Sequence, residues 1–162
     1  SLVRSKIVIM MELMITVAVM AILLTAALPN FRTALQNNRL TAQANELITA
    51  MQFARSEALK RGFPVELCSS SDGAVCGGDW NEGWLVYVDP PGAAPEVLRV
   101  WPGNGDDFSF TPADGEVRYQ PTGFADAAIQ LDLTLPECTG NNARQIIVEA
   151  TGRAASERTT CP

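Results

Sequence analysis

The feature that most constrains the fold is an apolar run over residues 7–28, whose single formal charge is Glu12. At a rise of about 1.5 Å per residue, a helix of this length reaches about 33 Å, enough to cross a hydrocarbon core of about 30 Å. The competing interpretation is a cleaved signal peptide with a small-residue site at Ala26 and Ala27. Signal peptides usually have apolar regions of about 7 to 15 residues, however, and the helical pattern here resumes after Pro29. We therefore interpret residues 7–28 as a transmembrane helix that stays attached.

Glu12 is the exception within this run, because a carboxylate in hydrocarbon costs about 2 to 3 kcal/mol even on lenient scales. One interpretation is that Glu12 lies near the start of the helix and reaches the head groups, or is protonated. The other is that it pairs with a positive group of a second subunit, which would make the helix an assembly element as well as an anchor. The residue type alone does not decide between them.

Residues 29–61 predict a helix of different character, because apolar residues recur at steps of three and four. These residues are Leu40, Ala44, Leu47, Met51, Ala54 and Ala58. Such a stripe is expected to pack against a sheet of the same chain. Pro29 is expected to kink the helix, since proline removes a donor and clashes with the preceding turn.

The composition changes at Gly62, because all twelve glycines and nine of the ten prolines lie from there onward. Helix therefore gives way to strands and turns. Short alternating or β-branched runs predict strands at 65–68, 84–88, 97–101, 116–120, 129–135 and 145–150. The segments 84–89 and 96–101 flank a proline-rich loop and predict a hairpin. The fold class is α+β, with a small antiparallel β domain over residues 62–162.

Charge divides at the same boundary. Seven of the twelve basic residues lie at or before Arg61, which leaves five arginines against fifteen acidic residues after it. Arg4 and Lys6 precede the apolar run and favour a short cytoplasmic segment over residues 1–6.

The four cysteines, Cys68, Cys76, Cys138 and Cys161, all follow the apolar run and form an even set. They indicate an oxidising compartment outside the cytoplasm. Of the three possible pairings we favour Cys68 with Cys76 and Cys138 with Cys161, because each closes a local loop. The segment around Thr159 and Thr160 is expected to be rich in turns.

The residues argue against catalysis. The chain has no histidine, which removes the commonest general base and the usual mixed zinc sites, and it has no phosphate-loop or nucleophile-elbow motif. Asp106, Asp107 and Asp114 are expected to be solvated turn residues, because their spacing fails the EF-hand pattern. The three tryptophans, Trp80, Trp84 and Trp101, are expected to pack in the core. We expect no enzyme activity, metal or cofactor.

The N-terminal pattern resembles the start of type IV pilins and pseudopilins. It consists of Glu12-Leu-Met-Ile-Thr-Val-Ala, Pro29 seventeen residues after the glutamate, and an amphipathic continuation. The resemblance implies that Glu12 neutralises the terminal amine of a neighbouring subunit during assembly. One departure concerns the prepilin peptidase, which in this family cleaves after a glycine that precedes an aromatic residue. Ile7 and Val8 hold those positions here, and no glycine precedes Gly62.

A second resemblance narrows the group. The segment Ala54-Arg-Ser-Glu-Ala58, with residues 64–68 and 83–89, resembles the GspH/FimT-type minor pseudopilins and minor pilins. It implies a single-pass protein of the bacterial inner membrane with a periplasmic domain and other pilin subunits as partners. The subunit would enter the tip or priming complex of a type IV pilus, or the pseudopilus of a type II secretion system.

The alternative function is a FimT-like minor pilin that captures DNA for natural transformation. That branch has a C-terminal Gly-Arg-x-Arg motif, whereas this chain has Gly152-Arg153-Ala154-Ala155, with Arg158 and Arg144 as substitutes for the missing arginine. Proteins that bind DNA tightly make about six to ten phosphate contacts. The excess of acidic residues after Arg61 repels phosphate, so DNA is not expected as a partner. A third class is a membrane-anchored domain unrelated to filaments.

Overall fold

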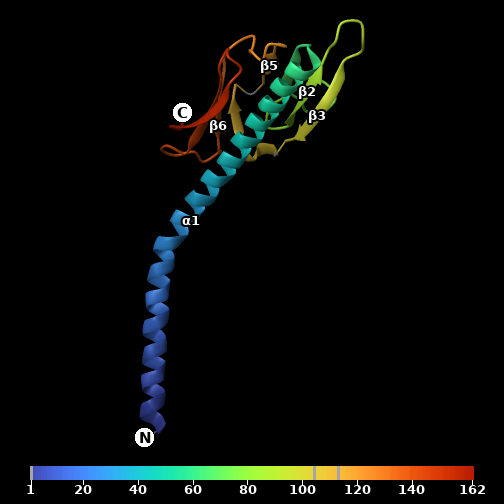
Figure 1. Cartoon of the computed structure of the whole chain (residues 1–162). Coiled ribbons are helices and arrows are strands. Elements are labelled where there is room, and N and C mark those ends of the chain that lie inside the picture. Colours follow the sequence, from blue (N-terminus) through green and yellow to red (C-terminus); the bar gives the residue numbers. More distant parts are fainter. Residues whose placement is uncertain (1, 104, 113) are drawn as a thin grey trace. The chain divides into compact units, whose positions relative to one another are not determined.

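The computed structural model describes residues 2–103, 105–112 and 114–162. A single helix, α1 (Leu2–Arg61), precedes all of the strands (Figure 1). The strands and one short 3-10 turn follow in the order β1 (Val65–Ser69), β2 (Gly83–Val88), β3 (Glu96–Pro102), η1 (Gly105–Asp107), β4 (Ser109–Thr111), β5 (Glu116–Tyr119), β6 (Ile129–Thr134), β7 (Ala143–Val148) and β8 (Ala154–Thr159). The chain divides into two compact units, Ser1–Asn38 and Arg39–Pro162, and this division falls inside α1.

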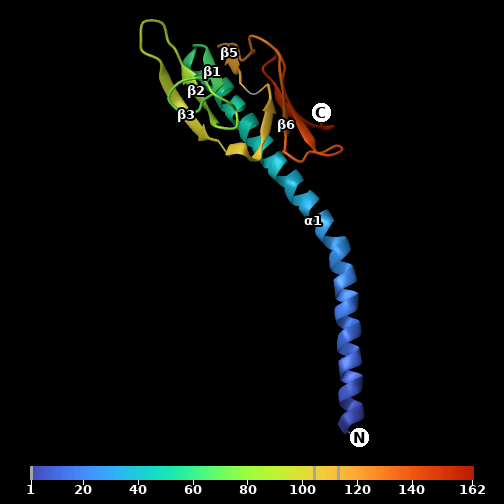
Figure 2. The ribbon, with the colours of Figure 1, turned by 180° about the vertical axis from the view of Figure 1, so that it is seen from behind.

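The strands form two antiparallel sheets, ordered β3-β2-β1-β5 and β4-β6-β7-β8. All six predicted strands are present, with ends that differ by at most two residues. The predicted hairpin is β2 with β3, in a register that places Trp84 opposite Trp101. Figure 2 shows β1, β2 and β3 side by side. The α+β expectation is confirmed, and the described residues form eight strands rather than six.

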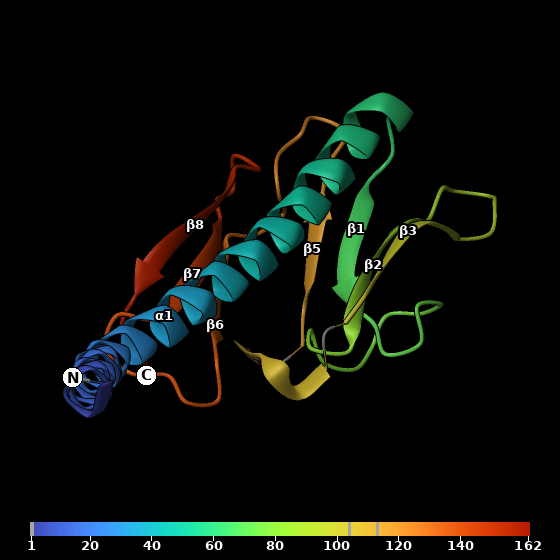
Figure 3. The same ribbon diagram turned by 90° about the horizontal axis from the view of Figure 1, so that it is seen from below.

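The C-terminal part of α1 contributes buried residues to a core that it shares with both sheets. Figure 3 shows this part of the helix passing over the strands, with β7 and β8 to one side of it and β1, β2 and β3 to the other. All six residues of the predicted apolar stripe are fully buried, and they pack in one cluster with residues of both sheets. The three tryptophans are also buried, as predicted. The 3.6-residue periodicity therefore identified the packing face correctly.

The end of α1 is fixed by both backbone and side chains. The N–H of Gly62 donates to the carbonyl of Ala58 at 3.0 Å, and Gly62 has φ 72°, a left-handed conformation that only glycine adopts freely. Arg61 contacts Glu57 at 2.9 Å and Glu96 of β3 at 3.1 Å. Hydrogen bonds from Arg61 and Lys60 hold the pKa of Glu57 below its ordinary value. These contacts join the end of the helix to the edge of the first sheet.

The prediction that the segment around Thr159 is rich in turns is wrong. Residues 154–159 form β8, which pairs with β7 from Val148↔Ala154 to Ala143↔Thr159. All residues of β8 are small or polar, so its sequence lacks the alternating apolar residues that predict a strand. The ladder with β7 holds it in strand conformation.

Candidate assembly helix and domain surfaces

The apolar part of α1 is the first candidate site. By length and composition, Lys6–Thr25 is long and apolar enough to cross a membrane, with a mean hydropathy of 2.7 and none of its residues buried. Its large side chains, such as Met14 and Ile22, are exposed along the whole segment. Within the described chain, nothing covers this apolar surface.

The polar groups of this segment fall into two kinds. The hydroxyls of Thr16 and Thr25 donate to the carbonyls of Leu13 and Ile22 at 2.8 and 2.7 Å, so the helix itself satisfies them. Glu12 is exposed, and among the residues that the structure describes no ion pair includes it. Glu12 is the one formal charge of the apolar run, and its role stays a prediction. Position 29 lies inside α1, and the kink expected there stays a prediction.

In the structure Cys68 is bonded to Cys76, and Cys138 to Cys161. The first bridge closes a loop that a buried serine organises: the hydroxyl of Ser70 donates to the carbonyl of Val75 at 2.6 Å. The second bridge ties the chain after β8 to the loop between β6 and β7. Both bridges restrain segments of irregular structure between or beyond the strands.

The carboxylate of Asp72 stabilises the first of these loops. It accepts hydrogen bonds from the N–H groups of Ala74 and Val75 at 2.8 and 3.1 Å. These bonds favour the ionised form and hold the pKa of Asp72 below its ordinary value. The loop is therefore fixed by a side chain as well as by a covalent bond.

The three arginines considered for DNA contact do not form one cluster. The β7–β8 register places Arg144 opposite Arg158. Arg153 lies at the β7–β8 turn, where its carbonyl accepts from the N–H of Glu149 at 2.9 Å. Arg158 lies five positions after Arg153 along the strand, which amounts to about 16 Å at about 3.3 Å per position. The structure thus brings together two of the three arginines.

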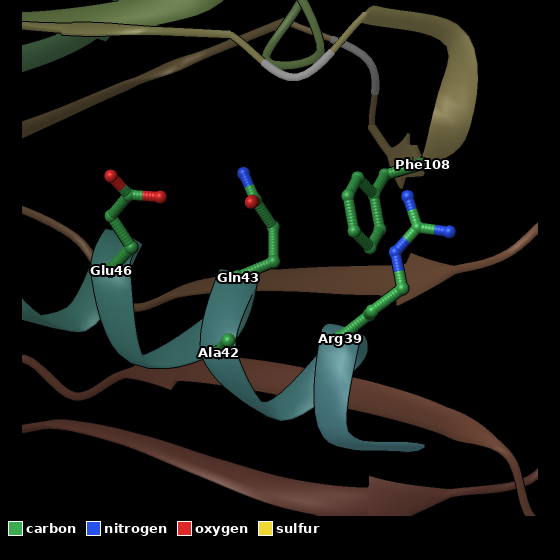
Figure 4. Close-up of a pocket in the computed structure, with 5 residues that line it drawn as sticks. All are labelled: Arg39, Ala42, Gln43, Glu46 and Phe108. Atoms are coloured by element: carbon green, nitrogen blue, oxygen red, sulfur yellow. The ribbon is translucent and has the colours of Figure 1, made fainter. Parts of the chain in front are cut away.

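A shallow groove of about 440 Å³ lies beside α1 and is lined by Arg39, Ala42, Gln43, Glu46 and Phe108 (Figure 4). The guanidinium of Arg39 lies 5.6 Å from the centre of the Phe108 ring and 2.5 Å from Asp107. Both partners of this ion pair are more than half exposed, so it contributes little to stability. Sequence reasoning did not find this groove, because no local pattern links the helix to the segment that carries Phe108.

Residues 43–152 match the family model described as type II transport protein GspH, which covers more than half of the chain. The chain belongs to the GspH family. The matched region begins in the amphipathic part of α1 and ends at Gly152, so it contains both Cys68 and Cys76 but not Glu12. No curated protein sequence matches this GspH-family chain.

The solved structures that resemble this GspH-family chain agree on its fold. Two crystal structures of the type IV minor pilin FimU from Pseudomonas aeruginosa match it with TM-scores of 0.59 and 0.57, each at 21% sequence identity. The first alignment covers 74% of this chain and 89% of FimU, and the second covers 73% and 92%. The fold is that of a minor pilin.

Proposed function

We propose that this chain is a minor pilin or pseudopilin, a structural subunit that assembles through its N-terminal helix into a filament. The filament would be a type IV pilus, where the subunit would join the tip or priming complex, or the pseudopilus of a type II secretion system. The observation that carries the proposal is the fully exposed apolar segment Lys6–Thr25 with Glu12 as its only internal charge. Membership of the GspH family supports it.

The physical argument concerns where this apolar surface is buried. Burying one large aliphatic side chain is worth about 1.5 to 3 kcal/mol, so a helix of this composition does not stay in water. A bilayer buries it before assembly, and the helices of neighbouring subunits bury it in a filament. A filament can offer Glu12 a positive partner from a neighbouring subunit, whereas lipid tails have none.

The proposed location follows from the same features. The helix spans the bacterial inner membrane once, and the domain after Arg61 lies in the periplasm, where its two disulfides persist. The proposed partners are other pilin or pseudopilin subunits. The prepilin peptidase is a further candidate partner, although Ile7 and Val8 do not match its cleavage site.

The test compares Glu12→Ala and Glu12→Gln with a matched control, Thr16→Ala, one turn further along α1. We expect all three variants to enter the membrane fraction, since one carboxylate costs little beside the surrounding apolar residues. We expect both Glu12 variants to be lost from sheared filaments, and Thr16→Ala to be retained. Normal incorporation of Glu12→Gln would show that the charge has no role in assembly. The components that co-purify with the filaments then distinguish a pilus from a pseudopilus.

A further inference from the structure

The hairpin of β2 and β3 contains a bulge that changes which side chains share a face. The register pairs Leu85 with Val100 and Tyr87 with Val97, with a shift between Val86 and Tyr87. In a regular strand, residues 97 and 100 would point to opposite faces, because side chains alternate. The extra residue, Leu98, places both valines on the same face. This face points away from the core, since Trp84 and Val86 occupy the core side of β2.

The same registers continue across the other two strands and define two rows on this side of the sheet. From β3 to β5, the rows are Val100, Leu85, Cys68, Glu116 and Val97, Tyr87, Glu66, Arg118. We call these eight residues the outer face. Neighbouring strands lie about 4.8 Å apart, so each row spans about 14 Å. The outer face is apolar over β3 and most of β2, and mostly charged over β1 and β5.

The apolar half forms a hollow of about 280 Å³. It is lined by Ala74, Val75, Cys76, Leu85, Tyr87, Pro95 and Val97. Val97 and Val100 are 40% and 44% exposed, and Val75, from the disulfide-bonded loop, is 64% exposed. Leu85 is buried and forms the floor. Apolar side chains that gather in one hollow beside charged residues can contribute to an interaction site.

The charged half has a net negative charge. A second hollow of about 320 Å³ is lined by residues that include Asp114 and Glu116, and it shares Cys76 with the apolar hollow. Arg118 lies 3.2 Å from Glu66 and 3.7 Å from Asp126, so two carboxylates already share its charge. Among the described residues, no ion pair includes Glu116.

We propose that the outer face docks a segment of another protein that presents apolar side chains next to lysine or arginine. The apolar side chains fill the hollow over β2 and β3, and the basic side chains lie against Glu116 and Asp114. A second copy of this chain is disfavoured as the occupant, because the region after Arg61 has fifteen acidic residues and five basic ones. This contact goes beyond assembly through the N-terminal helix and does not depend on it.

The test selects short random peptides displayed on phage against the full chain in neutral detergent, with counter-selection on the double variant Val97→Ser/Val100→Ser. Both valines are partly exposed, so this variant keeps the core intact, and retention of both disulfides checks its fold. We expect the recovered peptides to combine an apolar residue with a nearby lysine or arginine. The affinity of one recovered peptide is then measured for the parent and for three variants.

Val97→Ser/Val100→Ser and Glu116→Lys should each weaken this peptide about tenfold, and the effect of Glu116→Lys should shrink at high salt. The matched control is Glu157→Lys, an exposed glutamate on β8 of the other sheet, which should change the affinity less than about twofold. The proposal is wrong if no peptide is enriched, if the enriched peptides lack basic residues, or if Glu157→Lys acts like Glu116→Lys. It is also wrong if the parent chain self-associates and Val97→Ser/Val100→Ser abolishes this, since the occupant would then be a second copy.

Discussion

The guanidinium of Arg144 donates a hydrogen bond of 2.8 Å to the hydroxyl of Thr41, which joins β7 to α1 across 103 residues of sequence. Arg144 is one of the arginines considered for DNA contact, and it is partly buried and hydrogen-bonded to α1. Its neighbour across the ladder is Arg158, and Arg153 lies at the other end of β8. Two separated basic positions on an acidic domain are a poor basis for binding a polyanion.

We therefore predict that the full chain binds double-stranded DNA no more tightly than about 10⁻⁴ M at physiological salt, the range of weak non-specific binding. A titration of labelled DNA against the protein in neutral detergent measures this. Arg153→Ala should leave the result unchanged. Micromolar binding that weakens with salt and is lost in Arg153→Ala would instead make DNA capture the main function.

The second prediction concerns Gly152, which precedes β8. Its φ of +80° is strained for other residues, and a Cβ there would lie 2.0 Å from the carbonyl oxygen of Gly123. The change Gly152→Ala should lower the free energy of unfolding by at least about 3 kcal/mol, because it combines backbone strain with a backbone clash. Chemical denaturation of the full chain in detergent measures the effect.

Gly140 provides a matched control for this change. Its φ of +66° is similar, but an added Cβ would meet nothing within 4 Å. Gly140→Ala should therefore cost only the conformational strain, about 1 to 2 kcal/mol. An equal decrease in the free energy of unfolding in the two variants would show that the clash with the carbonyl oxygen of Gly123 does not affect stability.

The third prediction concerns the bridge between Cys138 and Cys161, which are separated by 23 residues. Replacing both with serine should cost about 3 kcal/mol in loop-closure models. It should also speed amide exchange near the C-terminus, where the N–H of Cys161 donates to the carbonyl of Gly140 at 2.9 Å. Peptide mapping without reductant checks the pairing, and a crossed pairing or free thiols would contradict it.

The fourth prediction concerns the two tyrosines, whose hydroxyls differ in environment. The hydroxyl of Tyr119 is buried, and in the described part of the chain it has no hydrogen-bond partner. Tyr119→Phe should therefore leave the stability at neutral pH unchanged or raise it by up to about 1 kcal/mol. The hydroxyl of Tyr87 instead donates to the carboxylate of Glu66. The same substitution there, Tyr87→Phe, should lower the stability by about 1 kcal/mol.

The pH dependence separates Tyr119 further. Burial raises its pKa from 10.0 to about 12, so its contribution to stability is complete below pH 10 and is lost as the pH rises towards 12. Tyr119→Phe should remove this loss. The free energy of unfolding of the variant should therefore rise relative to that of the parent as the pH increases from 10 to 12. Unfolding curves of both proteins across that range provide the measurement. A constant difference between them would contradict burial of the phenol.

The helix and the core could be predicted because their signals are local. Leu40, Leu47 and Met51 follow one face of a 3.6-residue period, and any sheet that covers this face buries them. The strand β8 could not be predicted, because residues 154–159 have no apolar alternation and depend on their long-range ladder with β7. The division into two sheets depends on pairing between distant strands, which local patterns do not specify.

The candidate sites divide in the same way. Glu12 is visible in the sequence because it interrupts an apolar run. The outer face is not visible, since it depends on the bulge at Leu98 and on a register that aligns Val100 with Leu85. A strict alternation would have assigned Val97 and Val100 to opposite faces, so the sequence pattern alone predicts no joint surface.

The packing of one helical segment against both sheets also determines how the domain bears a mechanical load. A pull along the axis of residues 39–61 strains the packing of Leu40, Leu47 and Met51 together, in shear, because all three lie in the core that both sheets share. A pull across a single strand pair would open its hydrogen bonds one after another. The domain is therefore held along the length of this helical segment, rather than at a single pair of strands.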